Sequence, residues 1–317
     1  MEFVPYHRPE RMVRLARLAE GSGFHEIWFC DHYHNRYVHS VLPLIATATE
    51  RVRLGPGVTN PYLVHPAVTA AAVATLNEVS GGRALLGISA GDPLFLRTVG
   101  IQQKNPVSAV REATVIIRGL LEGKKVSFEG DHFTCSGARL RFPPSSRIPI
   151  YIGGRRRKML ELAGSLADGA LINASHPEDI RECLEYIASG RRSRGKKFDA
   201  VAYMAVSVDR DEERARRAAR SVAAFIAASA PQESLRRHGV DEAEVERVRR
   251  FLAAGDIAAA REAVTERMVD GFSVSGGPKV IESRVDELRE MGIRSVVIGS
   301  PIGPDPERAL RLISGIL

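Results

Sequence analysis

One β-α-β unit decides the fold: residues 51–89 read RVRLGPGVTNPYLVHPAVTAAAVATLNEVSGGRALLGIS. The unit begins with a short aliphatic run at residues 51–55 and ends with another at residues 84–89. Between them, residues 66–79 form an alanine-rich helical pattern, whose small side chains allow a close approach to a sheet. Almost continuously apolar strands that alternate with helices are typical of a parallel sheet, either covered on both faces or closed into a barrel.

The same alternation continues on both sides of this unit. Further helices are predicted near residues 12–19, where apolar side chains recur at helical spacing, and over residues 107–121. The strand candidates lie at residues 2–5, 26–30, 51–55, 84–89, 148–152, 169–172, 200–208 and 295–298. Eight parallel strands favour a (β/α)₈ TIM barrel over an open doubly wound sheet. The glycine pattern of dinucleotide-binding sheets is also absent from the sequence.

A single barrel domain accounts for the whole length of 317 residues, since such a barrel needs roughly 250 residues and commonly carries insertions. Two irregular segments are predicted as those insertions, at about residues 122–147 and about residues 228–277. The first reads as a loop or a small hairpin around residues 128–146. Glycines and prolines break the helical stretches of the second. Both are candidate lids over one end of the barrel.

Composition limits the cellular setting and the partners. No apolar run is long enough for a membrane span, and the first residues lack the pattern of a signal peptide, so we expect a cytoplasmic protein without a membrane partner. The three cysteines are widely spaced, and we expect small buried thiols rather than disulfides or a metal site. The net charge of +7 could suit nucleic acid, but acids are interleaved with the basic residues and no recognition motif accompanies them. We therefore expect no nucleic-acid partner.

The ends of the strands are where a barrel of this kind carries its chemistry. Polar residues or glycines follow nearly every predicted strand. Asp31 follows the second strand, Thr59 and Asn60 the third, Asp92 the fourth and Asn173 the sixth. The sequence therefore predicts a ligand-binding rim at the carboxyl ends of the strands.

Gly153, Gly154 and Arg155 follow the fifth strand and precede a helix with further arginines in its first turn. Free backbone N–H groups and the helix dipole favour an anion there, and glycine lets the anion approach. This pattern predicts a phosphate site. A plain turn before a solvated basic helix would give the same pattern.

Carboxylates stand out in the predicted rim. Glu2 lies inside a short strand, where burial is costly unless the group faces a pocket and is hydrogen-bonded or titrates. Asp92 follows Gly91 at a strand exit. We predict that Glu2 and Asp92 are catalytic or substrate-orienting acids. Exposure of Glu2 beside a free terminus is the simpler alternative.

A metal-dependent barrel hydrolase is a remote alternative for the second strand exit. Asp31, His32, His34 and His39 could supply ligands there, and His176 and Asp305 could extend the set. The bridging lysine or further histidines expected after the middle strands are missing. We therefore predict no metal.

Several segments together resemble one known family. These segments are residues 2–5, 31–33, 54–62, 74–78, 82–84, 91–92, 168–175, 225–228, 237–239 and 299–305. They run nearly end to end and resemble the luciferase-like barrel enzymes, which use a flavin or a deazaflavin. Residues 2–5, 54–62 and 299–305 are similar to the group within that family that reduces methylenetetrahydromethanopterin with the deazaflavin coenzyme F-420.

The resemblance implies where the cofactor binds. It implies a non-prolyl cis peptide in a bulge of the third strand, between Gly57 and Val58, pressed against one face of the deazaflavin ring. The residues that it places around F-420 are Asp31, Gly57, Val58, Thr59, Asn60, Gly153, Gly154, Arg155 and Asn173. Glu2 and Asp92 match the acids of the family's pocket and would act near the pterin nitrogens.

The activity implied by the resemblance is hydride transfer from reduced F-420 to methylenetetrahydromethanopterin, or to a related methylene-pterin, to give the methyl-pterin. This is one-carbon chemistry of the kind used in methanogenesis. The family also implies a homo-oligomer, either a dimer or a tetramer. The alternatives are an F-420- or FMN-dependent oxidoreductase or monooxygenase acting on another small substrate, and a cofactor-binding relative without activity.

Overall fold

The structure is a computed structural model that describes residues 1–191 and 197–316 of the chain. It forms two compact units, which we describe separately. Unit 1 comprises residues 1–171 and 185–199, and unit 2 comprises residues 172–184 and 200–317. Within the described residues, every helix is too short or too polar to cross a membrane.

Unit 1 alternates strands with helices. Its elements are β1 (Glu2–Phe3), α1 (Pro9–Gly21), β2 (Glu26–Phe29), α2 (Val38–Ala48), β3 (Arg53–Pro56), α3 (Pro66–Val79), β4 (Leu86–Ile88), α4 (Pro93–Thr98), α5 (Pro106–Leu121), β5 (Val126–Glu129), β6 (Thr134–Ala138), β7 (Ile150–Gly154), α6 (Arg157–Leu166) and β8 (Gly169–Ile172). The boundary between the units crosses β8 and α7 (Pro177–Gly190).

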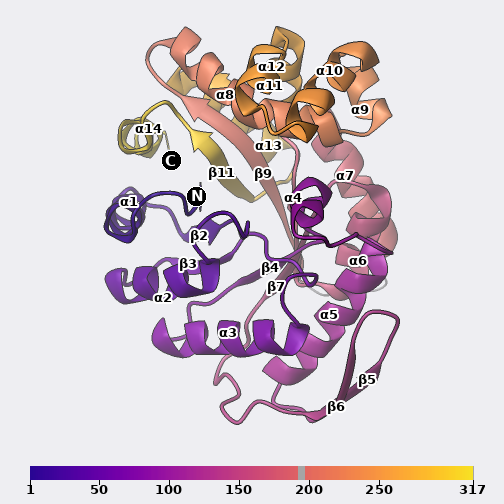
Figure 1. Ribbon diagram of the computed structural model, residues 1–317. Coiled ribbons are helices and arrows are strands. Elements are labelled where there is room, and N and C mark those ends of the chain that lie inside the picture. Colours follow the sequence, from indigo (N-terminus) through magenta and orange to yellow (C-terminus); the bar gives the residue numbers. More distant parts are fainter. Residues whose placement is uncertain (192–196, 317) are drawn as a thin grey trace. The chain divides into compact units, whose positions relative to one another are not determined.

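The strands of unit 1 are parallel. β1 pairs with β2, β2 with β3, and β4 with β7, while single bridges at Leu54–Ala84 and Thr59–Ile88 connect β3 to β4. The helices α1, α2, α3 and α5 pack against one another in chain order beside these strands (Figure 1). All the carboxyl ends of these strands therefore lie at the same edge, the edge at which parallel α/β sheets bind ligands.

The core of unit 1 is organised around Trp28, which is fully buried in β2. A Cβ added at Gly57 would lie 2.7 Å from the Cβ of Trp28, and one at Gly87 would lie 3.3 Å from its indole ring. The edge of the same indole packs on the Tyr151 ring, with the centroids 5.4 Å apart. Glycine is needed at Gly57 because Trp28 fills the space beside it, and at Gly87 mainly because a Cβ there would lie 2.6 Å from the carbonyl oxygen of Pro56.

Unit 2 is built on β9. Its elements are β9 (Asp199–Val208), α8 (Glu212–Ser229), α9 (Gln232–Arg237), α10 (Glu242–Ala253), α11 (Ile257–Glu262), α12 (Glu266–Phe272), β10 (Val274–Gly276), α13 (Pro278–Glu290), β11 (Ser295–Ile302) and α14 (Pro306–Ser314). Both β10 and β11 pair with β9 in parallel. The helices α10, α11 and α12 all pack on α8.

The predicted order of strands and helices is confirmed. Each of the eight predicted strands has a counterpart, namely β1, β2, β3, β4, β7, β8, β9 and β11. The helix predicted over residues 66–79 has the predicted bounds, and the apolar residues that define α1 (Met12, Leu15, Ala16 and Ala19) are all buried. The hairpin predicted around residues 128–146 is present as the antiparallel pair β5–β6, but it begins earlier, at Val126. The single-domain assignment stays a prediction.

Two local predictions are wrong. The eighth strand was predicted to end at residue 298, but β11 continues to Ile302 through an irregularity after Gly299, which contains a cis peptide at Ser300–Pro301. The irregularity keeps the segment paired with β9 despite its proline, whose missing N–H would break a regular ladder. Cys135 is only half-buried, because it lies on the exposed hairpin, whereas Cys30 and Cys183 are buried thiols as expected.

Glu112 of α5 fixes the turn of the β5–β6 hairpin. Its carboxylate accepts hydrogen bonds from the backbone N–H groups of Asp131, His132 and Phe133, at 3.0–3.1 Å. Burial alone would raise the pKa of Glu112, but these three hydrogen bonds outweigh it, and the pKa lies below its ordinary value. The ionised carboxylate therefore attaches the hairpin to α5.

We expect Glu112→Gln to destabilise the protein by about 2 kcal/mol, because an amide presents one acceptor oxygen to three donors. A carboxyl with a lowered pKa in the folded state adds stability above its unfolded pKa, and that stability is lost as the pH falls through the folded pKa. The difference in unfolding free energy between wild type and variant should accordingly shrink in acid. Urea denaturation at neutral pH and at about pH 4 measures it, and a difference that grows in acid would contradict this role.

Candidate active site

The exit of β3 carries a backbone bulge. The peptide between Gly57 and Val58 is cis, as the family resemblance implies. Gly57 N–H donates to the carbonyl of Phe29, and two residues later Thr59 N–H donates to that of Gly87, so the chain leaves β2 and resumes pairing with β4. This excursion of the third strand holds Val58 out of the regular ladder.

A buried acidic cluster, formed by Glu2 and Asp31, lies beside the bulge. Glu2 and Asp31 are only 5% and 7% exposed, and Cys30, which precedes Asp31, donates its backbone N–H to the carbonyl of Phe3, the neighbour of Glu2. Burial, followed by the charges of Glu2 and Asp31, raises the pKa of the Cys30 thiol well above its ordinary value. The Thr59 hydroxyl donates to Asp31 Oδ2 at 2.7 Å. The first three strands thus bring Glu2, Asp31 and Thr59 together. Glu2 is buried, so the alternative interpretation, in which it is exposed beside the terminus, is wrong.

Asn60 lies against Gly91, the residue before Asp92, at the neighbouring exits. The Asn60 side chain accepts hydrogen bonds from the N–H groups of Tyr62 and Leu63, at 3.1 and 3.2 Å, which fixes the turn after the bulge. Gly91 adopts a φ of +75°, and a Cβ there would lie 3.0 Å from the Cβ of Asn60. Asp92 Oδ1 accepts from Leu94 N–H at 2.8 Å and begins α4 as its N-cap. Asp92 therefore has a structural task, whatever it does in catalysis.

Gly153 and Gly154 end β7 close to the bulge. A Cβ at Gly153 would lie 2.8 Å from Val58 Cγ1 and 3.5 Å from Ser89 Cβ. The Ser89 hydroxyl donates to the Gly153 carbonyl at 2.7 Å. Arg155 follows, half-buried, just before α6. The exits of β3, β4 and β7 thus converge, and the glycine leaves just enough room for the branched side chain of Val58.

Asn173 belongs to unit 2, whereas the other predicted site residues belong to unit 1. It follows β8 and its side chain is exposed. The next residues of that exit are buried, and Ser175 Oγ accepts from the N–H of Ala205 in β9 at 3.0 Å. The role of Asn173 stays a prediction.

The histidines after β2 form an aromatic cluster. His32 and His34 stack with their ring centroids 5.5 Å apart, and both pack on Phe95 of α4, at 5.0 and 4.5 Å. Burial and the neighbouring His34 lower the pKa of His32. In residues 1–191 and 197–316, no three histidines, cysteines or carboxylates gather in the manner of metal ligands. The hydrolase alternative gains no support from this geometry.

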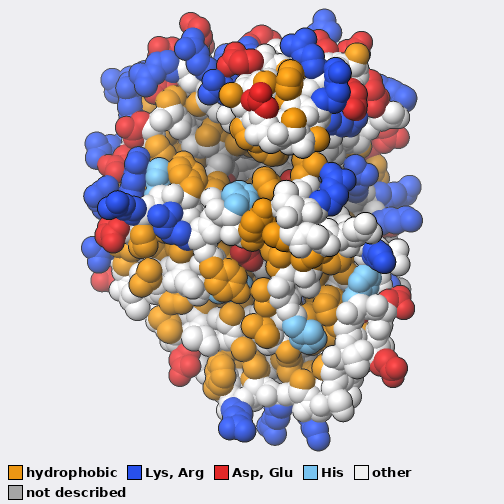
Figure 2. All heavy atoms as spheres, in the orientation of Figure 1, with side chains coloured by type: hydrophobic (Ala, Val, Ile, Leu, Met, Phe, Trp, Pro, Cys, Tyr) orange, Lys and Arg blue, Asp and Glu red, His pale blue; other side chains and the backbone are white. Residues whose placement is uncertain are grey.

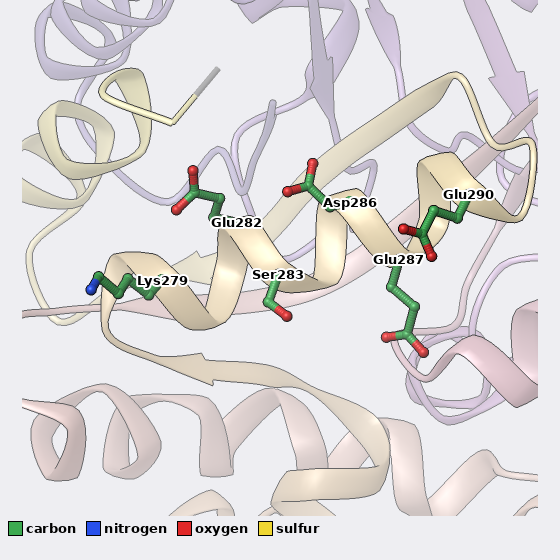
Figure 3. A pocket seen from close by; sticks show the side chains of 6 residues that line it. All are labelled: Lys279, Glu282, Ser283, Asp286, Glu287 and Glu290. Atoms are coloured by element: carbon green, nitrogen blue, oxygen red, sulfur yellow. The ribbon is translucent and has the colours of Figure 1, made fainter.

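An acidic hollow also lies along α13, far along the chain from these exits (Figure 3). Its lining residues are Lys279, Glu282, Ser283, Asp286, Glu287 and Glu290. Glu282 and Asp286 project on one side of the helix and Glu287 on the other, so the carboxylates do not converge (Figure 3).

Some residues that shape the site had no local pattern in the sequence to reveal them. Ser89 anchors the Gly153 carbonyl, and Gln103 Nε2 donates to the carbonyls of Ala90 and Gly91, at 2.6 and 2.8 Å. Both contacts join distant parts of the chain. Only the fold shows them.

Known proteins resemble the whole chain. The family described as luciferase-like monooxygenase matches residues 3–295. This chain belongs to the luciferase-like family. A 5,10-methylenetetrahydromethanopterin reductase from Archaeoglobus fulgidus is 48% identical over 320 residues, which cover 99% of this chain and 96% of that protein. A reductase of the same name from Methanolobus tindarius is 42% identical and covers 99% of this chain and 97% of its own length.

Solved structures agree with these relatives. The coenzyme F420 dependent tetrahydromethanopterin reductase from Methanopyrus kandleri superposes with a TM-score of 0.92 at 36% identity, covering 100% of this chain and 97% of that chain. An F420-dependent secondary alcohol dehydrogenase gives a TM-score of 0.80 at 21% identity, over 100% of this chain and 97% of its own. The predicted fold class, a luciferase-like (β/α)₈ TIM barrel, is therefore confirmed.

Thr59→Val tests the hydrogen bond between Thr59 and Asp31 in the buried acidic cluster. The substitution keeps the shape but leaves buried Asp31 without the hydroxyl that donates to it, so we expect a loss of about 1–3 kcal/mol in unfolding free energy. Thr59→Ser, which keeps the donor, should lose less. Guanidinium denaturation of both variants provides the comparison. Equal losses would show that the methyl group, not the hydrogen bond, supports this position.

Proposed function

We propose that this chain is a coenzyme F-420-dependent 5,10-methylenetetrahydromethanopterin reductase. It transfers a hydride from reduced F-420 to methylenetetrahydromethanopterin, or to a related methylene-pterin, and releases the methyl-pterin in methanogenesis-type one-carbon metabolism. The observation that carries the proposal is the match to named reductases over almost the full length of the chain, together with the buried acids Glu2 and Asp31 at the strand exits.

The residues around the bulge fit a flat, anionic cofactor. Gly153 leaves room for the Val58 side chain on the bulge, and the hydrogen bond between Thr59 and Asp31 places polar groups at the adjoining exits. In this proposal, Gly57, Val58, Thr59, Asn60 and Asp31 line the deazaflavin ring. The phosphate is held by Gly153, Gly154 and Arg155, and Asn173 completes the set. Bound F-420 supplies the hydride.

Glu2 and Asp92 complete the proposed mechanism. Burial beside Asp31 and Cys30 makes Glu2 sensitive to any charge that develops on a bound pterin. We assign Glu2 to hold or deliver a proton near the pterin nitrogens. Asp92 orients the pterin from the start of α4, a rigid position because its own carboxylate caps that helix. The rest of the catalysis is the positioning of two rings at reacting distance.

Titration with F-420 and with FMN tests the cofactor assignment. Purified protein should quench F-420 fluorescence with saturation and respond weakly to FMN. Mixing with reduced F-420 and methylenetetrahydromethanopterin should then restore the absorbance of oxidised F-420 at the rate of methyl-pterin formation. Tight FMN binding without any response to F-420 would favour a monooxygenase, the activity in the family's description. F-420 binding without turnover would leave an inert binder or another substrate.

The remaining assignments are proposals on the same basis. The protein acts in the cytoplasm on a small pterin substrate, needs no metal, and assembles as a homodimer or homotetramer. Light scattering of the eluted protein measures the assembly. We also propose that the whole chain is one barrel domain, and that its two insertions act as lids.

A further inference from the structure

His7, Arg11 and Arg36 form a basic cluster near the buried acidic cluster of Glu2 and Asp31. His7 lies in the short connection from β1 to α1, Arg11 lies in the first turns of α1, and Arg36 comes from the segment after β2. The Arg36 guanidinium donates to the carbonyl of Tyr6 at 2.7 Å, and its backbone N–H donates to that of Pro5. The rings of Tyr6 and His7 lie 4.1 Å apart. The two hydrogen bonds hold Arg36 against the connection from β1 to α1, which carries His7.

Two nitrogen atoms of the cluster are buried without a partner. Neither His7 Nε2 nor Arg11 Nε has a hydrogen-bond partner among the residues that the structure describes. Arg11 and Arg36 also form no ion pair with any carboxylate of residues 1–191 or 197–316. Buried polar groups are nearly always satisfied in native proteins, so unpartnered donors in a charged cluster point to an acceptor that comes from outside the chain.

The cluster is electrostatically prepared for an anion. Burial lowers the pKa of His7, and the positive charges of Arg11 and Arg36 lower it further. The charge of Glu2 acts on Tyr6, the neighbour of His7, so the cluster is next to the proposed catalytic acid. Lys and Arg side chains also gather on the surface over α1 (Figure 2). Guanidinium groups bind phosphate and carboxylate through two parallel hydrogen bonds.

We propose that His7, Arg11 and Arg36 form an anion-binding subsite at the exits of β1 and β2, which takes a phosphate or carboxylate group of the bound ligand. Arg11 and Arg36 supply the charge, and His7 donates from Nε2. The inference rests on the proposed function in one respect, since it assigns the anion to F-420 or to the pterin substrate. It names a second anion site, separate from the one proposed at Gly153 and Arg155.

The direct test uses inorganic phosphate and the NMR signal of His7, assigned by its loss in His7→Gln. Phosphate at constant ionic strength should raise the pKa of His7 in the wild-type protein, because a bound anion stabilises the imidazolium. Arg11→Gln should abolish this response. Arg111→Gln, which removes an exposed arginine of α5, should keep it. An unresponsive His7 in the wild-type protein would refute the subsite without reference to activity.

Kinetics then identify the source of the anion. Arg11→Gln and Arg36→Gln should each weaken the ligand concerned by about tenfold, the loss expected for one charge-assisted hydrogen bond. A higher KM for methylenetetrahydromethanopterin with unchanged F-420 quenching assigns the subsite to the substrate. Weaker quenching assigns it to F-420. Circular-dichroism melting confirms that the variants fold.

Two further outcomes separate the proposals. A wild-type protein without F-420 binding or turnover refutes the proposed function but leaves the phosphate response of His7 as an independent result. An active wild-type enzyme whose variants keep both affinities refutes the ligand assignment, even if His7 responds to phosphate.

Discussion

Glu2→Gln should lower kcat by about 100-fold or more and leave the affinity for F-420 nearly unchanged, since general acid–base groups contribute about 10² to 10⁴ in rate. Glutamine has the size of glutamate, so the packing around this residue, which is only 5% exposed, is retained. It has neither the negative charge nor a proton to transfer. Stopped-flow oxidation of reduced F-420 by methylenetetrahydromethanopterin measures the hydride step directly, apart from product release.

Glu26→Gln is the matched control. Glu26 begins β2, where it accepts from Trp28 Nε1 at 3.1 Å and pairs with Arg53, at the opposite end of the strand from Asp31. Its substitution removes the same charge and should alter stability more than kcat. The dependence of kcat on pH adds a second criterion. If Glu2 is the titrating acid, the part of the profile that reports its ionisation should disappear in Glu2→Gln. If Glu2→Gln kept wild-type kcat and an unchanged profile, Glu2 would be a structural carboxylate.

Glu2→Gln should also change the ionisation of the neighbouring Cys30 thiol. Burial is the main reason for the raised pKa of the Cys30 thiol, and the charges of Glu2 and Asp31 follow it. Glu2→Gln should lower that pKa. Thiolate absorbance or the alkylation rate of Cys30 as a function of pH reports it, which distinguishes a correctly placed glutamine from a collapsed pocket.

Most of the fold could be predicted from the sequence because its signals are local. A parallel strand buried on both faces is a short continuous apolar run, whereas apolar residues recur at helical spacing in a helix. The sequence therefore predicts which segments are strands, which are helices, and their order along the chain. Strand ends were less certain. The strand expected at residues 84–89 forms a regular ladder only over Leu86–Ile88, with a single bridge at Ala84, because hydrogen-bond geometry, not hydrophobicity, decides where a strand ends.

The site was only partly predictable for a related reason. Glu2, Asp31 and Thr59 are conspicuous as polar residues at strand ends, and the fold brings them together. Their neighbours are not conspicuous. His7 and Arg11 read as an ordinary helix start, and nothing in the sequence shows that two of their nitrogens are buried without partners. Contacts between residues far apart in the chain depend on the whole fold.

Gly153→Ala should weaken F-420 binding by about tenfold to a hundredfold, or about 1.4–2.8 kcal/mol. The added Cβ would lie 2.8 Å from Val58 Cγ1, closer than two carbon atoms can approach. Val58 is β-branched and has few alternative rotamers, so the bulge itself must move. Gly153 also has its carbonyl fixed by Ser89, which prevents β7 from retreating. Overpacking of this kind typically costs about 1–3 kcal/mol.

Two variants decide whether the loss comes from the bulge. Gly21→Ala adds a Cβ at the end of α1, where it would meet no atom within 4 Å, and should bind F-420 as tightly as the wild-type protein. The double variant Val58→Ala/Gly153→Ala removes the clashing methyl group. Its loss in unfolding free energy should be smaller than the sum of the losses of the two single variants. F-420 fluorescence quenching and thermal melting measure both effects. If Gly153→Ala bound F-420 as tightly as wild type, the cofactor would not rest on this bulge, because a displaced support cannot hold the ring in the same place.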